Sequence, residues 1–425
     1  MDESSIPSTA IYGGSLAHTF EYHTTGVHAM PHLHWSFPLQ EGATISCPVL
    51  VAENVVYVGD SAGFLSALDA RSGNLLWCFA TDWALDGGKP VGADAFTGVT
   101  AFCLAGKLGY VASAHQTLYE VDLSNGQALR SWDNEALEIP FGDITSLLFY
   151  DRFILFNDLE GSREGVFSCL DPATGSIYPS LFPFGNAIIY RHPGDGFDVI
   201  YGYELIDNAP PLPMYAVFRA IDLSPEDTQE DSTLWYMRKR EAEVHNKVYE
   251  GLYTVMDEVR EDLYTVMDKT VYVVCDLLLF LGGSAEAVPM IDDYGVSMST
   301  ELLALDPFTG AEQWRYTLPV GEDPFQVAAA SHLIFLVTRY GVEAIDTHTH
   351  QPRWEWTSNR DNRHVLVADG LLFVLDETGQ ITALDALTGE PRWSLQVEQP
   401  IKGQLSTIAD ATLYIVMDHI LCAFR

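Results

Sequence analysis

Four segments of this chain repeat one frame, in which an Asp stands eight residues before a Trp and, in three of them, a Gly lies midway. The frame residues are Asp69, Gly73 and Trp77; Asp306, Gly310 and Trp314; Asp346 and Trp354, with His350 at the Gly position; and Asp385, Gly389 and Trp393. Weaker copies begin at Glu120, Cys169 and Ala220. Self-similarity of this kind is typical of a repeat architecture, in which a long chain forms one domain.

Each repeat unit is predicted to contain a β-hairpin. An apolar strand ends in the Asp, whose side chain can accept hydrogen bonds from turn amides, and the Gly supplies the positive φ that the turn needs. The following strand carries the Trp. Two further β-rich runs precede the unit, for example residues 49–54 and 55–60. Four antiparallel strands per repeat of about 40–50 residues indicate a β-propeller blade.

The two ends of the chain complement each other. The C-terminal run from Thr412 to Arg425 lacks both the Asp-Gly turn and the Trp, whereas the run from His32 to Leu39 offers an outer strand with Trp35 as its Trp. We therefore expect an all-β fold, an eight-bladed propeller of four-stranded antiparallel blades, closed when the N-terminal strand joins the C-terminal blade. Closure would remove exposed sheet edges. Residues 31–425 form this single propeller, and residues 1–30 a partly disordered tail.

Three stretches interrupt the repeat and are interpreted as insertions: residues 204–218, 224–234 and 239–268. The first is rich in proline and the second is acidic. In residues 239–268 the apolar spacing fits one face of a helix, but a local duplication also fits a hairpin; we favour the helix. Because this region is irregular, seven or nine blades remain alternatives to eight.

Charge and composition exclude several classes of partner. The chain has 59 acidic and 22 basic residues, a net charge of −37, so binding to nucleic acid is not expected. No apolar run reaches the length of a membrane-spanning helix, and we expect no membrane insertion. The first residues lack a secretory signal, which favours the cytoplasm, or the periplasm or outside if a signal was removed. The six cysteines contain no CxxC pair and suit a reducing compartment.

No motif identifies a catalytic residue or a metal site. The G-x-S-x-G match around Ser61 is followed by a strand, whereas a nucleophile elbow needs a helix there, so it is interpreted as a hairpin turn. The pairs His32 with His34 and His348 with His350 have the spacing that chelates a metal from a strand, but no third ligand can be assigned.

The frame A-x-D-x-x-T-G-x-x-x-W resembles the tryptophan-docking motif of the pyrroloquinoline-quinone (PQQ) alcohol dehydrogenases and their non-enzymatic relatives. The resemblance recurs over nearly the whole chain. It implies that the motif tryptophans pack between neighbouring blades and that each pairs with the Gly of its own turn where one exists. These tryptophans are Trp77, Trp314, Trp354 and Trp393. Trp35 would take the same part in the composite blade.

The resemblance allows two kinds of function. The quinoproteins use PQQ, Ca²⁺ and a disulfide between adjacent cysteines, and this sequence has no adjacent cysteines. We therefore expect no cofactor and favour a non-catalytic scaffold, a monomer that binds an unknown protein partner through its loop-bearing faces. A similar role belongs to the propeller lipoprotein that assists outer-membrane assembly. The alternative is a quinoprotein-like oxidoreductase, or a propeller that binds a small ligand, with PQQ and Ca²⁺ in the central channel.

Overall fold

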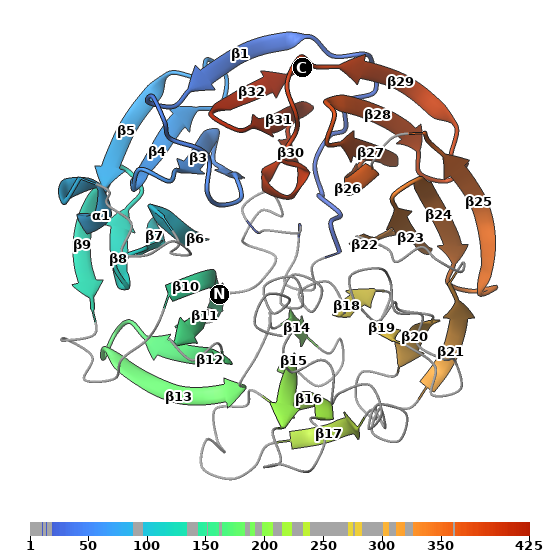
Figure 1. The fold of residues 1–425 in the computed structure, drawn as a ribbon, viewed down its shortest axis with the longest axis horizontal. Helices are drawn as coiled ribbons and strands as arrows, with labels where there is room; N and C mark the ends of the chain where they lie inside the picture. Colours follow the sequence, from blue (N-terminus) through green and yellow to red (C-terminus); the bar gives the residue numbers. More distant parts are fainter. Residues whose placement is uncertain are drawn as a thin grey trace, which may run out of the picture.

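The computed structural model describes residues 11, 14, 19–87, 97–133, 143–150, 152–160, 164–182, 188–191, 198–206, 215–222, 233–238, 271–274, 277–282, 301–305, 312–318, 326–359 and 362–425. Over these residues the strands form eight four-stranded antiparallel sheets. In seven sheets the strands are neighbours in chain order. Figure 1 shows the sheets arranged around a common centre; in seven of them the first strand lies inside and the fourth outside, and in the eighth β30 lies inside and β1 outside. The fold is a β-propeller.

After β1 (Leu33–Pro38), the first half of the chain forms three sheets of four consecutive strands. Their strands are β2 (Leu50–Ala52), β3 (Val55–Gly59), β4 (Phe64–Asp69) and β5 (Leu75–Ala80); β6 (Val99–Ala105), β7 (Leu108–Ser113), β8 (Thr117–Asp122) and β9 (Gln127–Trp132); and β10 (Asp143–Tyr150), β11 (Phe153–Glu160), β12 (Glu164–Asp171) and β13 (Ser176–Phe182). A short helix, α1 (Asp82–Leu85), follows β5.

The later sheets repeat the same order. Their strands are β14 (Ile188–Arg191), β15 (Asp198–Ile206), β16 (Tyr215–Asp222) and β17 (Thr233–Arg238); β18 (Val271–Val274), β19 (Leu277–Gly282), β20 (Glu301–Leu305) and β21 (Glu312–Thr317); β22 (Gln326–Ala330), β23 (Leu333–Thr338), β24 (Gly341–Asp346) and β25 (Gln351–Thr357); and β26 (Asn362–Ala368), β27 (Leu371–Asp376), β28 (Gln380–Asp385) and β29 (Pro391–Gln396). A 3₁₀ turn, η5 (Gly403–Leu405), precedes the last three strands, β30 (Thr407–Ala409), β31 (Thr412–Met417) and β32 (Ile420–Phe424).

Burial differs between inner and outer strands for a physical reason. Strands β23, β27 and β31, each second from the inside of its sheet, are buried at every position, because both faces of a blade pack against neighbouring blades. The outer strands alternate, since one side faces solvent. β1, β21 and β29 have the same burial pattern, in which the third residue, a Trp, is the one buried position. Trp35 thus takes the same position in its strand as Trp314 and Trp393.

The first and last strands of the chain lie in one sheet. β1 pairs antiparallel with β32, with Trp35 opposite Ala423 and Phe37 opposite Leu421, and the strand order is β1-β32-β31-β30. The N-terminal strand therefore covers an edge of β32 that would otherwise be open to pairing with another chain.

The predicted tail, residues 1–30, is described only in part, and residues 19–27 of it lie against the propeller. The Tyr22 amide donates to the Val367 carbonyl at 2.7 Å, and the Ala411 amide donates to the Thr25 carbonyl at 2.9 Å. Tyr22 is buried among residues of the two last sheets. The segment is retained because its amides and apolar side chains find partners on β26 and on the β30–β31 turn.

The predicted insertions are described only in part. Residues 204–206 and 215–218 are not a loop, since they extend β15 and β16 and pair there, with Ile206 opposite Tyr215. Residues 233–234 begin β17. The choice between helix and hairpin for residues 239–268 lies outside the described residues. Within the described part of the chain, no helix has the length and apolar character needed to span a membrane.

Candidate functional site

The Asp of each described motif organises its own turn. Asp69 Oδ1 accepts from the Ser72 amide at 2.8 Å, and Asp385 Oδ1 accepts from the Thr388 amide at 3.0 Å. The Gly389 amide donates to the Asp385 carbonyl at 2.8 Å, and Gly389 has a φ of +72°. A carboxylate acceptor and a left-handed residue close the turn together, which is why the motif joins Asp and Gly at this spacing. Asp306 and Gly310 lie outside the described residues.

These carboxylates are ionised acceptors. The hydrogen bond from the Ser72 hydroxyl holds the pKa of Asp69 below its usual range. The Arg392 guanidinium does the same for the pKa of Asp385, with a contact of 2.6 Å. Hydrogen bonds to the charged form of an acid stabilise that form. The turns are therefore held by charge-assisted bonds at neutral pH.

The motif tryptophans do not pair with the Gly of their own turn, as expected from the resemblance, but with the Gly of the next blade. A Cβ built on Gly73 would lie 2.6 Å from the Trp35 ring, one on Gly126 2.5 Å from the Trp77 ring, and one on Gly389 2.6 Å from the Trp354 ring. The expectation failed because each Trp extends from the outer strand toward the following blade.

The indole N–H completes this contact between blades. It donates to the carbonyl of the residue that follows the motif Asp in the next blade, at distances of 2.9–3.1 Å. The pairs are Trp35 with Ala70, Trp77 with Leu123, and Trp354 with Ala386. Because these acceptors are backbone carbonyls, which every residue has, the sequence could not predict which residue accepts the hydrogen bond.

Three described seams depart from this rule. After β9 the carbonyl of Pro172, which follows the motif residue Asp171, accepts from the Arg130 guanidinium. Trp314 stacks on His350, with ring centroids 4.9 Å apart and an interplanar angle of 21°, and its N–H has no hydrogen-bond partner among the described residues. His350 occupies the Gly position with a φ of +58°. At the third seam, the N–H of Trp393 donates to the Val27 carbonyl at 2.8 Å. The composite blade has no motif turn, and the N-terminal segment takes its place.

The remaining sequence motifs have structural roles in the described residues. Ser61 lies in the β3–β4 turn, and its hydroxyl accepts from the Thr44 amide at 2.9 Å. His348 lies in a turn rather than on a strand and is 3.9 Å from Asp346. In the described part of the chain, no group of three or more His, Cys, Asp or Glu residues is arranged to hold a metal ion. Four cysteines with described side chains are free: Cys47, Cys78, Cys103 and Cys422.

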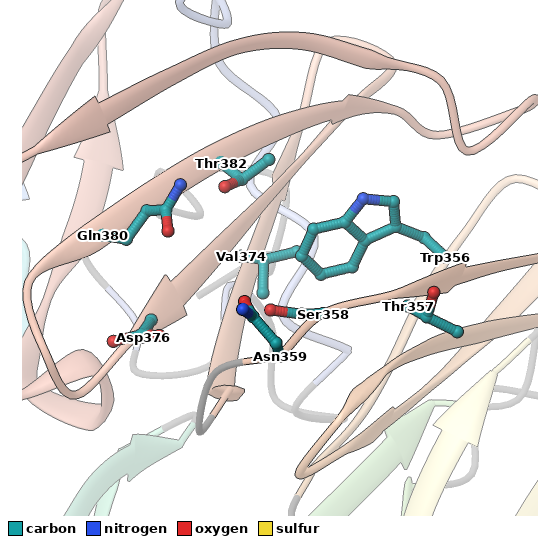
Figure 2. Close-up of a pocket in the computed structure, with 8 residues that line it drawn as sticks. All are labelled: Trp356, Thr357, Ser358, Asn359, Val374, Asp376, Gln380 and Thr382. Atoms are coloured by element: carbon teal, nitrogen blue, oxygen red, sulfur yellow. The ribbon is translucent and has the colours of Figure 1, made fainter.

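A pocket of about 510 Å³ lies between the sheet of β22–β25 and the sheet of β26–β29 (Figure 2). One side is the end of β25 and the residues after it, and the other side is β27, β28 and the turn between them. The lining residues are Trp356, Thr357, Ser358, Asn359, Val374, Asp376, Gln380 and Thr382. Such a volume suits a small molecule.

The described lining of this pocket does not fit a PQQ and calcium site. Calcium needs six to eight oxygen ligands, and a quinone needs an aromatic platform near a base. Trp83 and Trp356 are the tryptophans outside the docking positions. Trp83 is buried in α1, and Trp356 shares its pocket with one carboxylate, that of Asp376. One carboxylate among the described lining residues is too few for a calcium cage.

Comparison with known proteins agrees with this architecture. The family model described as outer membrane protein assembly factor BamB matches residues 299–424. The serine/threonine-protein kinase AfsK of Streptomyces griseus is 30% identical over 131 residues, which are 27% of this chain and 16% of the kinase. This chain thus matches only a small part of that relative.

Solved structures match over most of the chain. Quinohemoprotein alcohol dehydrogenase from Comamonas testosteroni has a TM-score of 0.62 at 12% identity, covering 98% of this chain and 80% of the enzyme. Europium-containing methanol dehydrogenase has a TM-score of 0.60 at 12% identity, covering 96% and 90%. At this identity the likeness concerns the fold alone. Residues 299–424 belong to the PQQ-like repeat family, and the chain as a whole has the fold of the PQQ-like β-propellers.

Proposed function

We propose that this chain is a non-catalytic scaffold for protein–protein interaction, built as a ring of eight blades that β1 closes. The pairing of β1 with β32 supports the closure, and eight four-stranded sheets among the described residues support the count. A ring sealed by tryptophans between blades is rigid, and it can present a fixed surface to a partner.

One observation carries the proposal: a set of exposed leucines, here called the leucine rim, on three outer strands. Its members are Leu33 on β1, Leu75 and Leu76 on β5, and Leu129 on β9, each 52% exposed. These strands follow one another around the ring in Figure 1. All four residues lie near the start of an outer strand and therefore near the same edge of the ring.

Other outer strands do not begin in this way. β21 starts with Glu312, β25 with Gln351 and β29 with Pro391, and the residue after Pro391 is Arg392. Among the strands whose side chains are described, the exposed leucines lie on β1, β5 and β9, and outside the strands Leu85 and Leu387 are exposed as well. Leu75 and Leu76 are adjacent on β5, and Leu33 and Leu129 lie on the outer strands of the blades on either side; we propose that one partner contacts these exposed apolar side chains together.

The charge of the chain indicates the nature of the partner. A net charge of −37 repels acidic proteins and attracts basic ones at long range. We infer a partner that lays apolar side chains on the leucine rim and carries positive charge around them. The cysteines whose side chains are described are free thiols, which favours the cytoplasm as the compartment of this chain.

Affinity capture with matched variants tests this proposal. The rim variant is Leu75→Glu with Leu129→Glu, and the control is Gln351→Glu with Pro391→Glu, which places two carboxylates at the start of other outer strands. A protein captured by the wild type and the control, but lost with the rim variant, supports the proposal. Capture of the same proteins by all three chains would show that the leucine rim is not a binding surface.

A further inference from the structure

Each of the eight sheets has an outer strand whose second edge pairs with no strand in the described part of the chain. An unpaired edge presents backbone amides and carbonyls to other chains, and natural proteins protect such edges with charged residues and proline. Seven of the eight outer strands are protected in this way. β1 and β13 contain a proline, β9 and β17 an arginine, β21 two charged residues, and β25 and β29 both a proline and an arginine.

The remaining outer strand, β5, has no such protection. Its six residues, LLWCFA, include neither a charged residue nor a proline. Its inner edge pairs with β4, and no other described backbone hydrogen bond uses an amide or a carbonyl of residues 75–80. Leu76 and Cys78 lie two positions apart, on one face of the strand, and both side chains are exposed. Figure 1 shows β5 on the outside of the ring with no strand beyond it.

The residues around β5 select the charge of a segment that adds to it. Asp82 and Asp86 follow the strand, and the Asp86 side chain is 75% exposed. Within the described residues, neither carboxylate forms an ion pair with Lys or Arg. The turn before β5 carries one charge of each sign, on Asp69 and Arg71. A positive charge is therefore favoured beside the end of β5 and is not needed beside its start.

The net charge of the chain decides between two kinds of occupant. Two copies of this chain, each with a charge of −37, repel each other, which disfavours pairing of β5 with β5 of a second copy. The same field attracts a basic protein.

We propose that the free edge of β5 binds an extended segment of a basic partner protein by strand addition. The segment runs antiparallel to β5, as neighbouring strands of the sheet do, and its apolar side chains pack on Leu76 and Cys78. A Lys or Arg at its N-terminal end lies beside Asp86. Backbone hydrogen bonds supply the affinity, and the apolar and basic side chains supply the selectivity. This inference rests on the leucine rim as a contact surface and adds how the partner is held there.

The first experiment titrates the full chain into the peptide Lys-Lys-Val-Thr-Val-Thr-Val-Thr, labelled with fluorescein at its C-terminus, and follows fluorescence anisotropy at about 150 mM NaCl. One comparison peptide has every amide of the Val-Thr run N-methylated, so it keeps the side chains and charges but loses the backbone donors. In another, Glu replaces both Lys. We expect saturable binding of the first peptide, none of the N-methylated peptide, and binding weaker by at least about tenfold for the Glu peptide.

Variants and amide exchange locate the binding. Cys78→Lys gives β5 the kind of charge that other outer strands carry, and it should weaken binding of the first peptide by at least about tenfold. Ser131→Lys is the matched control, because Ser131 is exposed and holds the equivalent position on β9. Circular dichroism confirms that both variants are folded. In the wild type, the bound peptide should slow deuterium uptake by residues 75–80 and leave residues 127–132 unchanged.

Each other outcome contradicts strand addition to β5 by a basic partner. Absence of saturable binding, equal binding of the N-methylated peptide, or equal affinity in Cys78→Lys and wild type would show that this edge does not take a strand. Equal affinity for the Glu peptide would contradict the basic character of the partner. None of these results bears on affinity capture through Leu75 and Leu129, so the scaffold proposal can stand or fail separately.

Light scattering of the chain alone tests the competing occupant. We expect a monomer in both the wild type and Cys78→Lys. A wild-type dimer that Cys78→Lys abolishes would make a second copy of the chain the occupant of β5, and would overturn the proposal.

Discussion

The seam at Trp393 offers a direct measure of how the N-terminal segment stabilises the propeller. The Trp393 indole is buried, packs with Phe373 at a centroid distance of 5.9 Å, and donates to the Val27 carbonyl at 2.8 Å. Trp393→Phe keeps an aromatic ring at the seam but removes the donor. Trp314→Phe makes the same change at a seam where no described residue accepts a hydrogen bond from the N–H.

The contrast between the two seams gives the expected difference in the free energy of unfolding of the two Phe variants. Both substitutions shrink a side chain whose residue is 8% exposed, so the loss of packing is similar in the two variants. Only Trp393→Phe leaves a buried carbonyl without its donor, which costs about 1–3 kcal/mol. We therefore expect Trp393→Phe to lower the free energy of unfolding by about 1–3 kcal/mol more than Trp314→Phe does. Trp393→Ala should cost about 3–5 kcal/mol, because it also opens a cavity.

Urea unfolding followed by far-UV circular dichroism measures these differences, with the slope of each transition checked against that of the wild type. The signal reports β-structure and is insensitive to the loss of one indole fluorophore. Equal destabilisation by the two Phe variants would refute the claim that the Trp393–Val27 bond stabilises the seam. A near-neutral Trp393→Ala would refute the docking of Trp393 altogether.

Three further predictions rest on other contacts. Gly389→Ala should be destabilised by more than Gly370→Ala, since both positions have a φ near +70° but only a Cβ at Gly389 would collide with a tryptophan ring; equal thermal unfolding midpoints would contradict this packing. Deletion of residues 1–38 removes β1 and uncovers β32, so light scattering should detect association, and a monomer as stable as the full chain would disprove the closure. Burial raises the pKa of the Cys47 thiol to about 12, so little of it is thiolate at pH 8, whereas Cys78 is exposed. Iodoacetamide should therefore label Cys78 before Cys47 in the folded chain, as followed by peptide mapping. Fast labelling of Cys47 would contradict its burial.

The strand pattern could be predicted from sequence because it is local. The spacing of Asp, Gly and Trp specifies a turn followed by an outer strand, and the motif Asp residues bond to amides two or three residues away. The pairing of the chain ends was also accessible, because the run around Trp35 carries the strand that the last blade lacks. The contacts of residues 19–27 could not be predicted, because their long-range backbone partners lie on the last three sheets, more than 300 residues away.

The identity of each contact between blades was beyond the sequence. Three of the four clear repeats contain both a Trp and their own Gly, so pairing within a repeat and pairing with the next one predict the same sequence there. The direction in which the outer strand faces its neighbour decides between them, and that direction is a property of the assembled ring. The same holds for Trp356 and Asp376, which are 20 positions apart in the chain and line one pocket because two blades meet there.

The sequence by itself determined the repeat, the turns, the strand order and the acidic character of the surface, since these depend on local hydrogen bonding, on φ angles and on composition. The tertiary structure alone decided which Trp packs on which Gly and how the N-terminal segment replaces a missing turn at Trp393. These features depend on how the blades are placed relative to one another. Contacts between blades produce no regular spacing of residues that could be recognised in the sequence.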